Sequence, residues 1–320
     1  MTSIRWGLLG AGWIATRALA PAMHAANDTI VQAVASRDAK RSEALNPITI
    51  HESYESLIND PLVDAVYISL PNHLHCKWTV AALNAGKHVL CEKPFAMNTA
   101  EVEIMIQAAR DNDRLLVEAV WSRWHPRMIR MVDYVKAGNI GDIVSIQSSF
   151  TFPASIDENY RAVPAMGGGA LFDIGVYPLH AMAALVGDNA PVEIEKREVN
   201  IGPTGIDLTT TWQMRFNGSV AAHGLASFEM PENQSLIVRG EKESVELIGK
   251  EAFTSWHAKS SLRLGEQVEE FDGVDPYRLM VENFGKKLQG QSSWVLPLET
   301  SLSVAKMVEQ LQFFAMPTAR

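Results

Sequence analysis

The stretch IRWGLLGAGWIATRALAPAMHA, residues 4–25, decides the fold of this chain. A short apolar run leads into a glycine turn, and a helical pattern follows directly. Gly10, Gly12 and Ala15 fit the pattern G-x-G-x-x-A. The first glycine permits a tight turn, the second lets the backbone approach a pyrophosphate, and the small third residue allows the helix to pack closely on the strand. The stretch therefore predicts the first βαβ turn of a dinucleotide-binding domain, with phosphates at the helix N-terminus.

The next strand, in TIVQAVASRDAKRSEAL (residues 29–45), ends in Ser36 and Arg37, and Arg41 follows one helical turn later. A site selective for NAD usually has an acidic residue here, which binds the ribose 2′-hydroxyl. A hydroxyl and a guanidinium suit a 2′-phosphate instead, because arginine offers a bidentate fork to phosphate oxygens. The alternatives are that Asp38, one residue later, serves NAD, or that the arginines are solvated surface charges. The sequence favours NADP.

Strands and helices keep alternating through the first part of the chain, which predicts a parallel doubly wound sheet that binds ligands beyond the carboxyl ends of its strands. Two loops at such ends carry polar residues, Pro71–His75 and Glu92–Pro94. His73 and His75 have no third metal ligand at suitable spacing, so we expect hydrogen bonding within the loop and no metal site. Lys93 at the mouth of a sheet requires a partner, such as a substrate or a catalytic acid, because its desolvation is unfavourable.

Past Pro126 the alternation stops, and a helix ending near Gly138 is followed by a long predicted strand, residues 143–152. Further strands are predicted at Val192–Asn200, Asp207–Phe216, Ser219–Phe228, Leu236–Gly240 and Ser244–Ile248, and helices at about Pro276–Gln289 and Leu298–Phe314. Trp212, Met214 and Phe216 alternate with polar residues, which indicates a sheet with one face on helices and the other wet or covered by a partner.

The fold class predicted is α/β: an N-terminal Rossmann domain, residues 1–122, and a C-terminal α+β domain with a large, mainly antiparallel sheet, residues 123–320. The last helix is a candidate to pack back on the first domain. The substrate is expected in the cleft between the domains. A homo-oligomer, dimer or tetramer, is expected through the broad sheet face of the second domain.

The segment AMGGGALFDIGVYPLHAMAALVG, residues 165–187, carries Asp173, Tyr177 and His180 at positions i, i+4 and i+7. In a helix these three side chains share one face and could together move a proton. The alternative is a buried amphipathic helix whose polar groups hydrogen-bond locally. Pro178 weakens the helix prediction, because it cannot donate to the carbonyl four residues earlier and would kink the segment.

A formal net charge of −9 argues against a general nucleic-acid or anionic-membrane binder, which would present a basic face. The two cysteines, Cys76 and Cys91, form no disulfide framework and favour a reducing compartment. The N-terminus begins with a strand pattern and has no signal-peptide pattern, and no apolar run approaches the length that crosses a bilayer. We expect a cytoplasmic protein.

Four pieces, GLLGAGWIA, LPNHLH, GKHVLCEKPFAMN and GGGALFDIGVYPLHA, resemble the glucose–fructose oxidoreductase, inositol dehydrogenase and rhizopine-catabolism family, written Gfo/Idh/MocA. They run in the family's order and spacing, and the predicted two-domain layout extends the match over essentially the whole chain. The resemblance implies an NAD(P)-dependent oxidoreductase acting on a sugar, cyclitol or related polyol carbon.

Carried over by position, Lys93 matches the family's Glu-Lys-Pro lysine and Asp173 its aspartate after the glycines. Inositol-type members have His where this chain has Tyr177. Tyrosine there resembles the glucose–fructose oxidoreductase, dimeric dihydrodiol dehydrogenase and NADP-linked xylose dehydrogenase branch, which often uses NADP. His180 stands where inositol-type members often have Asp, and we assign it to substrate contact.

Oxidation of an alcohol requires removal of the hydroxyl proton, and a Lys93 ammonium nearby would favour a phenolate, so our hypothesis is Tyr177 as general acid/base, with Lys93 and Asp173 tuning and orienting. The remaining candidate substrate contacts are aromatic faces and arginine forks, which suit sugar rings, at Arg123, Trp124, Tyr160 and Arg161. The expected cofactor contacts lie on the glycine turn and the loops after the strands: Gly10, Gly12, Trp13, Ile14, Ser36, Arg37, Arg41, Leu70, Pro71, Asn72, His75, Glu92 and Lys93. Plain core packing is the alternative for Trp124.

Three other functions fit the same scaffold. A non-catalytic NADP-sensing regulator would bind cofactor without turnover, and Lys93, Asp173 and Tyr177 count against it. An NAD-retaining glycosidase of the same family would give no net cofactor reduction. A reductase of keto-sugars or dicarbonyls would run the chemistry the other way, and sequence does not reveal direction.

Overall fold

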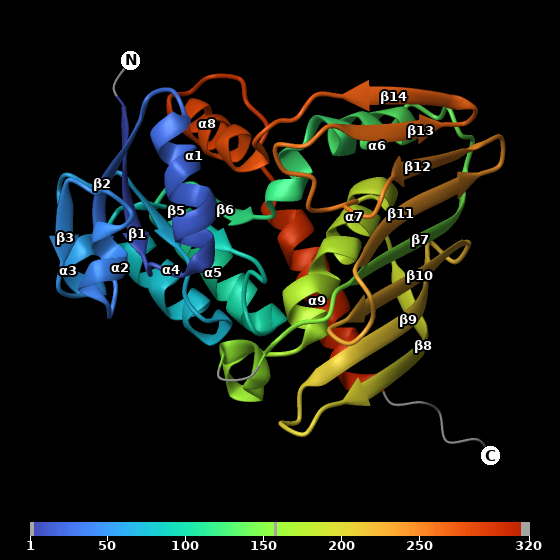
Figure 1. Cartoon of the computed structure of the whole chain (residues 1–320), viewed down its shortest axis with the longest axis horizontal. Coiled ribbons are helices and arrows are strands. Elements are labelled where there is room, and N and C mark those ends of the chain that lie inside the picture. The colour runs from blue at the N-terminus through green and yellow to red at the C-terminus, as the bar shows by residue number, and fades with distance from the viewer. Residues whose placement is uncertain (1–2, 157–158, 315–320) are drawn as a thin grey trace. The chain divides into compact units, whose positions relative to one another are not determined.

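The computed structural model of the chain describes residues 3–156 and 159–314. It divides into two compact units, each with its own sheet and core (Figure 1). Unit 1 consists of Met1–Trp121 and Asp275–Leu298, and unit 2 of Ser122–Val274 and Glu299–Arg320. The chain therefore leaves unit 1, forms most of unit 2, and returns to unit 1 before its last helix.

Unit 1 is built on a parallel sheet that, among the described residues, has six strands in the order β3-β2-β1-β4-β5-β6. The strands are β1 (Ile4–Leu9), β2 (Thr29–Ala35), β3 (Thr49–His51), β4 (Ala65–Ile68), β5 (His88–Glu92) and β6 (Leu116–Ala119). The strand order reverses between β1 and β4, and such a switch point opens a crevice at the carboxyl ends of the strands. The predicted doubly wound parallel sheet is confirmed.

Helices cover both faces of this sheet, because right-handed crossovers from β1 and from β4 run in opposite directions. The helices are α1 (Ala20–Ala25), α2 (Ala39–Glu43), α3 (Tyr54–Ile58), α4 (His75–Asn84), α5 (Thr99–Asp111) and α8 (Pro276–Leu288). Helix α8 packs against α1, and its Phe284 ring lies 5.0 Å from the buried Trp6 ring, centroid to centroid. Tyr277, also on α8, stacks on Trp121 at 4.7 Å. A late segment of the chain thus completes the core of unit 1.

Unit 2 holds a mainly antiparallel sheet, with eight described strands in the order β14-β13-β12-β11-β7-β10-β9-β8. The strands are β7 (Ile143–Thr151), β8 (Val192–Ile201), β9 (Asp207–Phe216), β10 (Val220–Ser227), β11 (Asn233–Gly240), β12 (Ser244–Ile248), β13 (Ser260–Leu264) and β14 (Gln267–Phe271). Strands β7 and β10 pair in parallel, and the other neighbours pair antiparallel. This large sheet confirms the predicted α+β architecture, although the sequence pattern does not predict β13 and β14.

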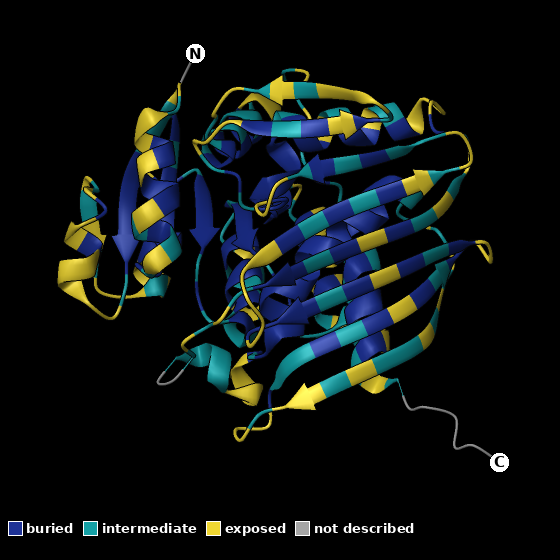
Figure 2. Ribbon diagram, turned by 45° about the vertical axis from the view of Figure 1, so that its right-hand side comes forward, coloured by how far each residue is buried: buried dark blue, intermediate teal, exposed yellow. Residues whose placement is uncertain are grey.

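One face of the second sheet is covered by α6 (Pro126–Lys136) and α7 (Val176–Val186), while α9 (Leu298–Phe313) closes the chain. Trp212, Met214 and Phe216 are buried on the helix-covered face, as their alternation predicts. Figure 2 shows buried and more exposed positions alternating along these strands. The other face of the sheet is more polar, and no helix of the described residues covers it (Figure 2).

The glycine-rich segment is helical from Leu171 onward. A π-helical turn, Leu171–Gly175, leads directly into α7, so that Pro178 lies inside a continuous helical segment. The expectation of no membrane-length apolar run is wrong by length and composition, because the helical segment Pro164–Val186 contains an 18-residue stretch with a mean hydropathy of 1.4. The structure gives the physical reason for this hydropathy: 94% of the most apolar part of this segment is buried inside the unit, as in a core helix.

Candidate functional site

The glycine turn after β1 has one side that is open. Gly10 has φ +95°, and a Cβ atom there would lie 2.7 Å from the Ser69 carbonyl oxygen, so only glycine fits. A Cβ on Gly12 would meet no atom within 4 Å. The helical segment that follows begins with backbone N–H groups that have no partner inside a helix. A pyrophosphate fits this turn, since it would occupy the space beside Gly12 and accept from those groups. Trp13 is 69% exposed beside the same turn, and Ile14 is half-buried.

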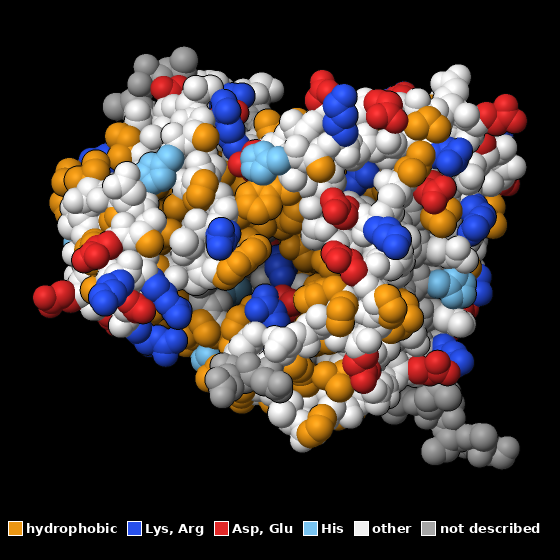
Figure 3. Space-filling model, in the orientation of Figure 1, with side chains coloured by type: hydrophobic (Ala, Val, Ile, Leu, Met, Phe, Trp, Pro, Cys, Tyr) orange, Lys and Arg blue, Asp and Glu red, His pale blue; other side chains and the backbone are white. Residues whose placement is uncertain are grey.

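Exposed arginines follow the end of β2, and the nearby Asp38 carboxylate already has hydrogen-bond and ion-pair partners. Asp38 caps α2 by accepting from the Arg41 backbone N–H at 3.2 Å, and its other oxygen lies 3.4 Å from the Arg41 Nε. The Ser36 hydroxyl donates to the Asp38 carbonyl at 2.7 Å. Arg37 and Arg41 are exposed, and Figure 3 shows Lys and Arg side chains gathered over the region of α2. An anionic group suits this end of the strand better than a hydroxyl does.

His75, at the start of α4, joins two loops of unit 1. Its Nδ1 lies 2.8 Å from the Pro94 carbonyl oxygen, and its Nε2 lies 2.8 Å from the Leu70 carbonyl oxygen. The loop hydrogen-bonding role expected from sequence is therefore what the geometry gives this ring. Among the described residues no three His, Cys, Asp or Glu side chains gather as metal ligands would. Of the neighbouring cofactor candidates, Leu70 and Asn72 are buried and Pro71 is half-buried.

Glu92 and Lys93 end the neighbouring strand β5. The Tyr67 hydroxyl donates to one Glu92 carboxyl oxygen, and the Lys93 backbone N–H donates to the other at 3.2 Å. Burial raises the pKa of Glu92 to about 7, and the Lys93 charge and the Tyr67 hydrogen bond offset only part of this rise. The half-buried Lys93 side chain thus stands at the ligand edge of the sheet beside a carboxyl group that titrates near neutral pH.

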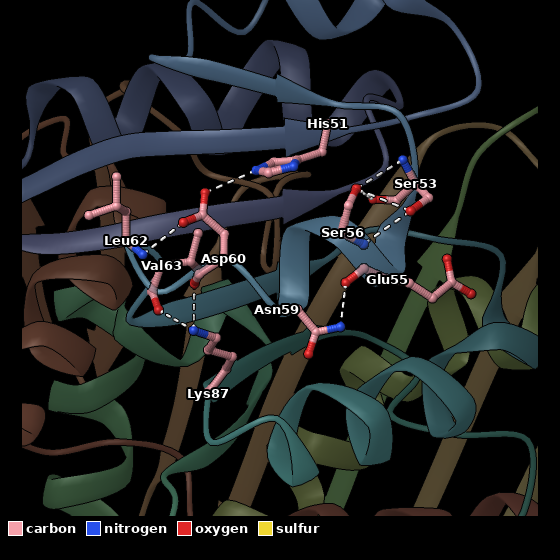
Figure 4. Close-up of polar contacts among 9 residues, drawn as sticks. All are labelled: His51, Ser53, Glu55, Ser56, Asn59, Asp60, Leu62, Val63 and Lys87. Carbon is pink, nitrogen blue, oxygen red and sulfur yellow. Dashed lines mark hydrogen bonds and ion pairs between the residues drawn. The ribbon is translucent and has the colours of Figure 1, made fainter.

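A second lysine at the opposite end of β5 shows what a structural lysine looks like. Lys87 donates from its Nζ to the carbonyl oxygens of Asp60 and Val63, at 2.7 and 2.8 Å (Figure 4). The Asp60 carboxylate in turn lies 3.0 Å from the His51 Nε2. These contacts hold the turn that enters β4, at the edge of the sheet away from the glycine turn.

In unit 2, Asp173 forms an ion pair with Arg161, whose Nε lies 2.7 Å from its Oδ2. The Arg161 guanidinium also lies over the Tyr160 ring, 5.0 Å from the centroid. Burial alone would lower the pKa of Arg161, but the charge of Asp173, with Tyr160 and Tyr177 nearby, raises it. Four of the predicted residues therefore belong to one electrostatic cluster in this unit.

Tyr177 is buried on α7, and its ring packs against Phe150 at 5.4 Å and Phe253 at 6.1 Å. His180 is fully buried one turn further along the helix. The Arg123 guanidinium donates to the His180 carbonyl at 3.0 Å, and burial lowers the pKa of Arg123 to about 10. Trp124 is also buried. The phenol thus has a fixed aromatic setting, while Arg123 braces the helix that carries it.

The triple glycine, residues 167–169, allows close contact between the backbone there and other parts of unit 2. A Cβ on Gly168 would lie 2.4 Å from the Arg161 carbonyl oxygen, and Gly169, with φ +113°, would carry a Cβ 2.0 Å from the Asp207 Oδ1. The other Asp207 oxygen accepts from the Leu171 N–H at 2.8 Å and from the Thr210 hydroxyl at 2.7 Å. The glycines therefore bring Arg161 and the start of the helix together within unit 2.

Sequence reasoning missed three supporting residues of unit 2. Asp207 holds the start of the helical segment, and His125 caps α6 by accepting from the Arg127 N–H. The Arg127 side chain donates to the backbone carbonyls of Glu251 and Ala252, between β12 and β13. Burial lowers the pKa of His125 to about 4. The one available signal is the His-Pro pair that opens α6, since proline favours the first helical position.

Comparisons with known proteins agree with this architecture. Residues 4–119 match the family model described as "Oxidoreductase family, NAD-binding Rossmann fold", and residues 128–246 match the GFO/IDH/MocA C-terminal domain. The chain is 30% identical to D-xylose 1-dehydrogenase (NADP(+)) 2 of Haloferax volcanii, over 96% of this chain and 95% of the relative. It is 33% identical to mouse trans-1,2-dihydrobenzene-1,2-diol dehydrogenase, over 72% and 70% of the two chains. A crystal structure of a 3-ketoreductase from Actinomadura kijaniata, in complex with NADP and TDP-benzene, superposes with a TM-score of 0.88 at 28% identity, and the match covers 97% of each chain.

Proposed function

The chain belongs to the GFO/IDH/MocA oxidoreductase family, and we propose that it is an NADP-preferring dehydrogenase or reductase acting on a CH–OH group of a sugar, cyclitol or diol. One observation carries the proposal: the glycine turn after β1 and Lys93 after β5 stand at the same carboxyl edge of one parallel sheet. An anion-binding turn and an amine at one such edge suit a dinucleotide beside a reacting hydroxyl.

The preference for NADP is supported by the end of β2. The exposed Arg37 and Arg41 suit a 2′-phosphate, and Asp38 is engaged in capping α2. Two similar proteins are named or solved with NADP, the Haloferax dehydrogenase and the Actinomadura ketoreductase. Gly10, Gly12 and the loops after β4 and β5 would hold the rest of the cofactor.

Oxidation of an alcohol requires transfer of a hydride and of a proton, and we propose a different group for each. The bound cofactor supplies the hydride acceptor or donor. Tyr177 moves the hydroxyl proton as general acid/base, and the Lys93 ammonium hydrogen-bonds the substrate oxygen and favours the phenolate. Asp173 orients the site through its ion pair with Arg161. Arg161, Tyr160, His180, Arg123 and Trp124 remain the proposed substrate contacts or their supports.

The test begins with cofactor titration, NADPH against NADH, followed by a panel of aldoses, cyclitols and trans-diols with the preferred cofactor. Tighter binding of NADPH and turnover of at least one polyol are expected. Saturable binding of the cofactor with no turnover of any polyol would favour the regulator alternative and would contradict the proposed dehydrogenase or reductase.

The acid/base role is tested by Tyr177→Phe. Because a positioned acid/base contributes roughly 10²–10⁴-fold, kcat should fall by that factor while NADPH affinity stays near normal. Near-normal turnover in this variant would rule out the role.

A second candidate is reduction of a keto-sugar as the main direction, favoured by the similarity to the ketoreductase over the whole chain. Comparing kcat/KM for sugar oxidation with NADP and for ketose or dicarbonyl reduction with NADPH separates the two directions.

We further propose that the protein is a cytoplasmic homo-oligomer. Within the part of the chain that the structure describes, one face of the second sheet carries no helix (Figure 2), and Ala221, Leu225 and Ile237 are half-buried among polar residues on that face. Cys76 and Cys91 are both free, in keeping with a reducing compartment. Light scattering across a concentration series would distinguish a monomer, which would exclude the oligomer, from a dimer or tetramer.

A further inference from the structure

We propose that His75 is a positioning residue that fixes the Lys93–Pro94 turn against the loop after β4, without touching cofactor or substrate. This inference rests on the proposed function, because that function gives Lys93 its role. It keeps the loop hydrogen bonding expected of His75 from sequence and replaces the second expectation, that of a direct cofactor contact.

The first support is the enclosure of the ring. The His75 side chain is 0% exposed, so no surface of the imidazole is available to a ligand. Its two nitrogens meet the carbonyl oxygens of Leu70 and Pro94, each at 2.8 Å. Both ring nitrogens of His75 therefore contact backbone carbonyl oxygens.

The second support is where those carbonyls stand in the fold. Leu70 follows β4 and Pro94 follows β5, and these strands are neighbours, with Ile68 paired to Cys91. The peptide bond between Lys93 and Pro94 is cis. One buried ring therefore connects the turn that leads to Asn72 with the turn that carries Lys93.

The chemistry of imidazole makes this connection hard to replace. Carbonyl oxygens only accept, and a neutral ring has one N–H, so both contacts are hydrogen bonds only when the ring is charged. The pKa of His75 is lowered overall, because burial is the largest influence on it. The two carbonyls and Glu118 on β6 act to raise this pKa, and Lys93 acts to lower it. In either protonation state the ring fills the gap between the two carbonyls, and a side chain without two opposed nitrogens does not reproduce this geometry.

The expected consequence concerns the position of Lys93. The Tyr67–Glu92 hydrogen bond holds the ends of the strands, and the His75 ring is the brace beyond them. Because a displacement of about 1 Å at a reacting group can lower the rate roughly 100-fold, losing the brace should affect kcat more than cofactor binding.

The experiment compares His75→Gln with the matched control His73→Gln. His73 lies two residues earlier in the same turn, and its Nδ1 has no hydrogen-bond partner among the described residues. The first readout needs no cofactor: acetic anhydride labelling of Lys93, measured by mass spectrometry across pH relative to the exposed Lys40. The second is kcat with the best substrate from the panel, alongside the Kd for NADPH.

For His75→Gln we expect a shift in the pH dependence of Lys93 labelling and a fall in kcat of roughly tenfold or more, larger than the change in Kd. His73→Gln should stay within a factor of about two in both readouts, since no hydrogen bond is lost. A folded His75→Gln protein with wild-type labelling and turnover would overturn the proposal.

If His75→Gln does not fold, histidine C2–H exchange is measured in the wild-type protein instead. Because the His75 ring is enclosed, it should exchange roughly tenfold or more slowly than the His73 ring. Equal exchange rates would overturn the proposal. If the wild type turns over no substrate, the proposed function fails, while Lys93 labelling and C2–H exchange still decide the role of His75.

Discussion

Two glycine-rich segments of this chain look alike in sequence and differ in structure. A Cβ on Gly12, in the turn after β1, would meet nothing within 4 Å, whereas a Cβ on Gly168 or Gly169 would come within 2.4 Å of the protein's own atoms. The first segment leaves room for something outside the chain, and the second makes room for the chain itself. What a missing side chain would touch therefore separates a ligand-binding glycine from a packing glycine.

The largest effect should follow from Gly169→Ala. Its φ of +113° and the 2.0 Å approach to the Asp207 Oδ1 combine backbone strain with a steric clash. The free energy of unfolding should fall by about 3 kcal/mol or more, measured by urea denaturation. Gly187→Ala is the matched control: it has φ +99° but no atom within 4 Å of its Cβ, so strain alone should cost roughly 1 kcal/mol. Equal losses in the two variants would contradict the packing role.

Gly12→Ala tests the other half of the comparison. The added methyl group meets no protein atom, so the urea midpoint should stay close to that of the wild type. The methyl group would occupy the approach to a pyrophosphate, and the Kd for NADPH should rise roughly 10- to 100-fold, about 1.4–2.8 kcal/mol. Unchanged NADPH affinity in fluorescence titration would show that this glycine is not at the phosphates.

A smaller effect sharpens which cofactor the open segment serves. Arg37→Ala should weaken NADPH binding roughly fivefold, about 1 kcal/mol for a partly exposed charged contact, and leave NADH binding unchanged. Lys40→Ala, three residues along on the same exposed surface, is the control and should change neither. Equal weakening of both cofactors by Arg37→Ala would argue against a 2′-phosphate contact.

The fold of unit 1 could be predicted because its signals are local. The glycine pattern lies within six residues, and each strand is followed by its own helix. The inward face of β9 could likewise be predicted from the alternation of Trp212, Met214 and Phe216. The return of α8 to unit 1 could not, since an apolar stripe shows that a helix is covered but not by which sheet.

The site was harder to predict, because its contacts join residues far apart in the chain. Asp207 holds the N–H of Leu171, 36 residues earlier, and the Tyr67 hydroxyl meets Glu92, 25 residues later. No periodic pattern encodes such pairs. Lys93, Asp173 and Tyr177 were therefore predicted from their residue types and from the family resemblance. Their catalytic roles remain predictions.

The discontinuity of unit 1 has a consequence for synthesis on the ribosome. Trp6 emerges early, but Phe284 of α8, which packs on it, emerges only after most of unit 2. Domains generally fold N-terminal first during translation. Unit 1, however, lacks the helix that covers part of its core until the chain is nearly finished. The nascent sheet must therefore wait with an apolar face uncovered, so chaperone demand should be greatest in the interval before residue 288 leaves the exit tunnel.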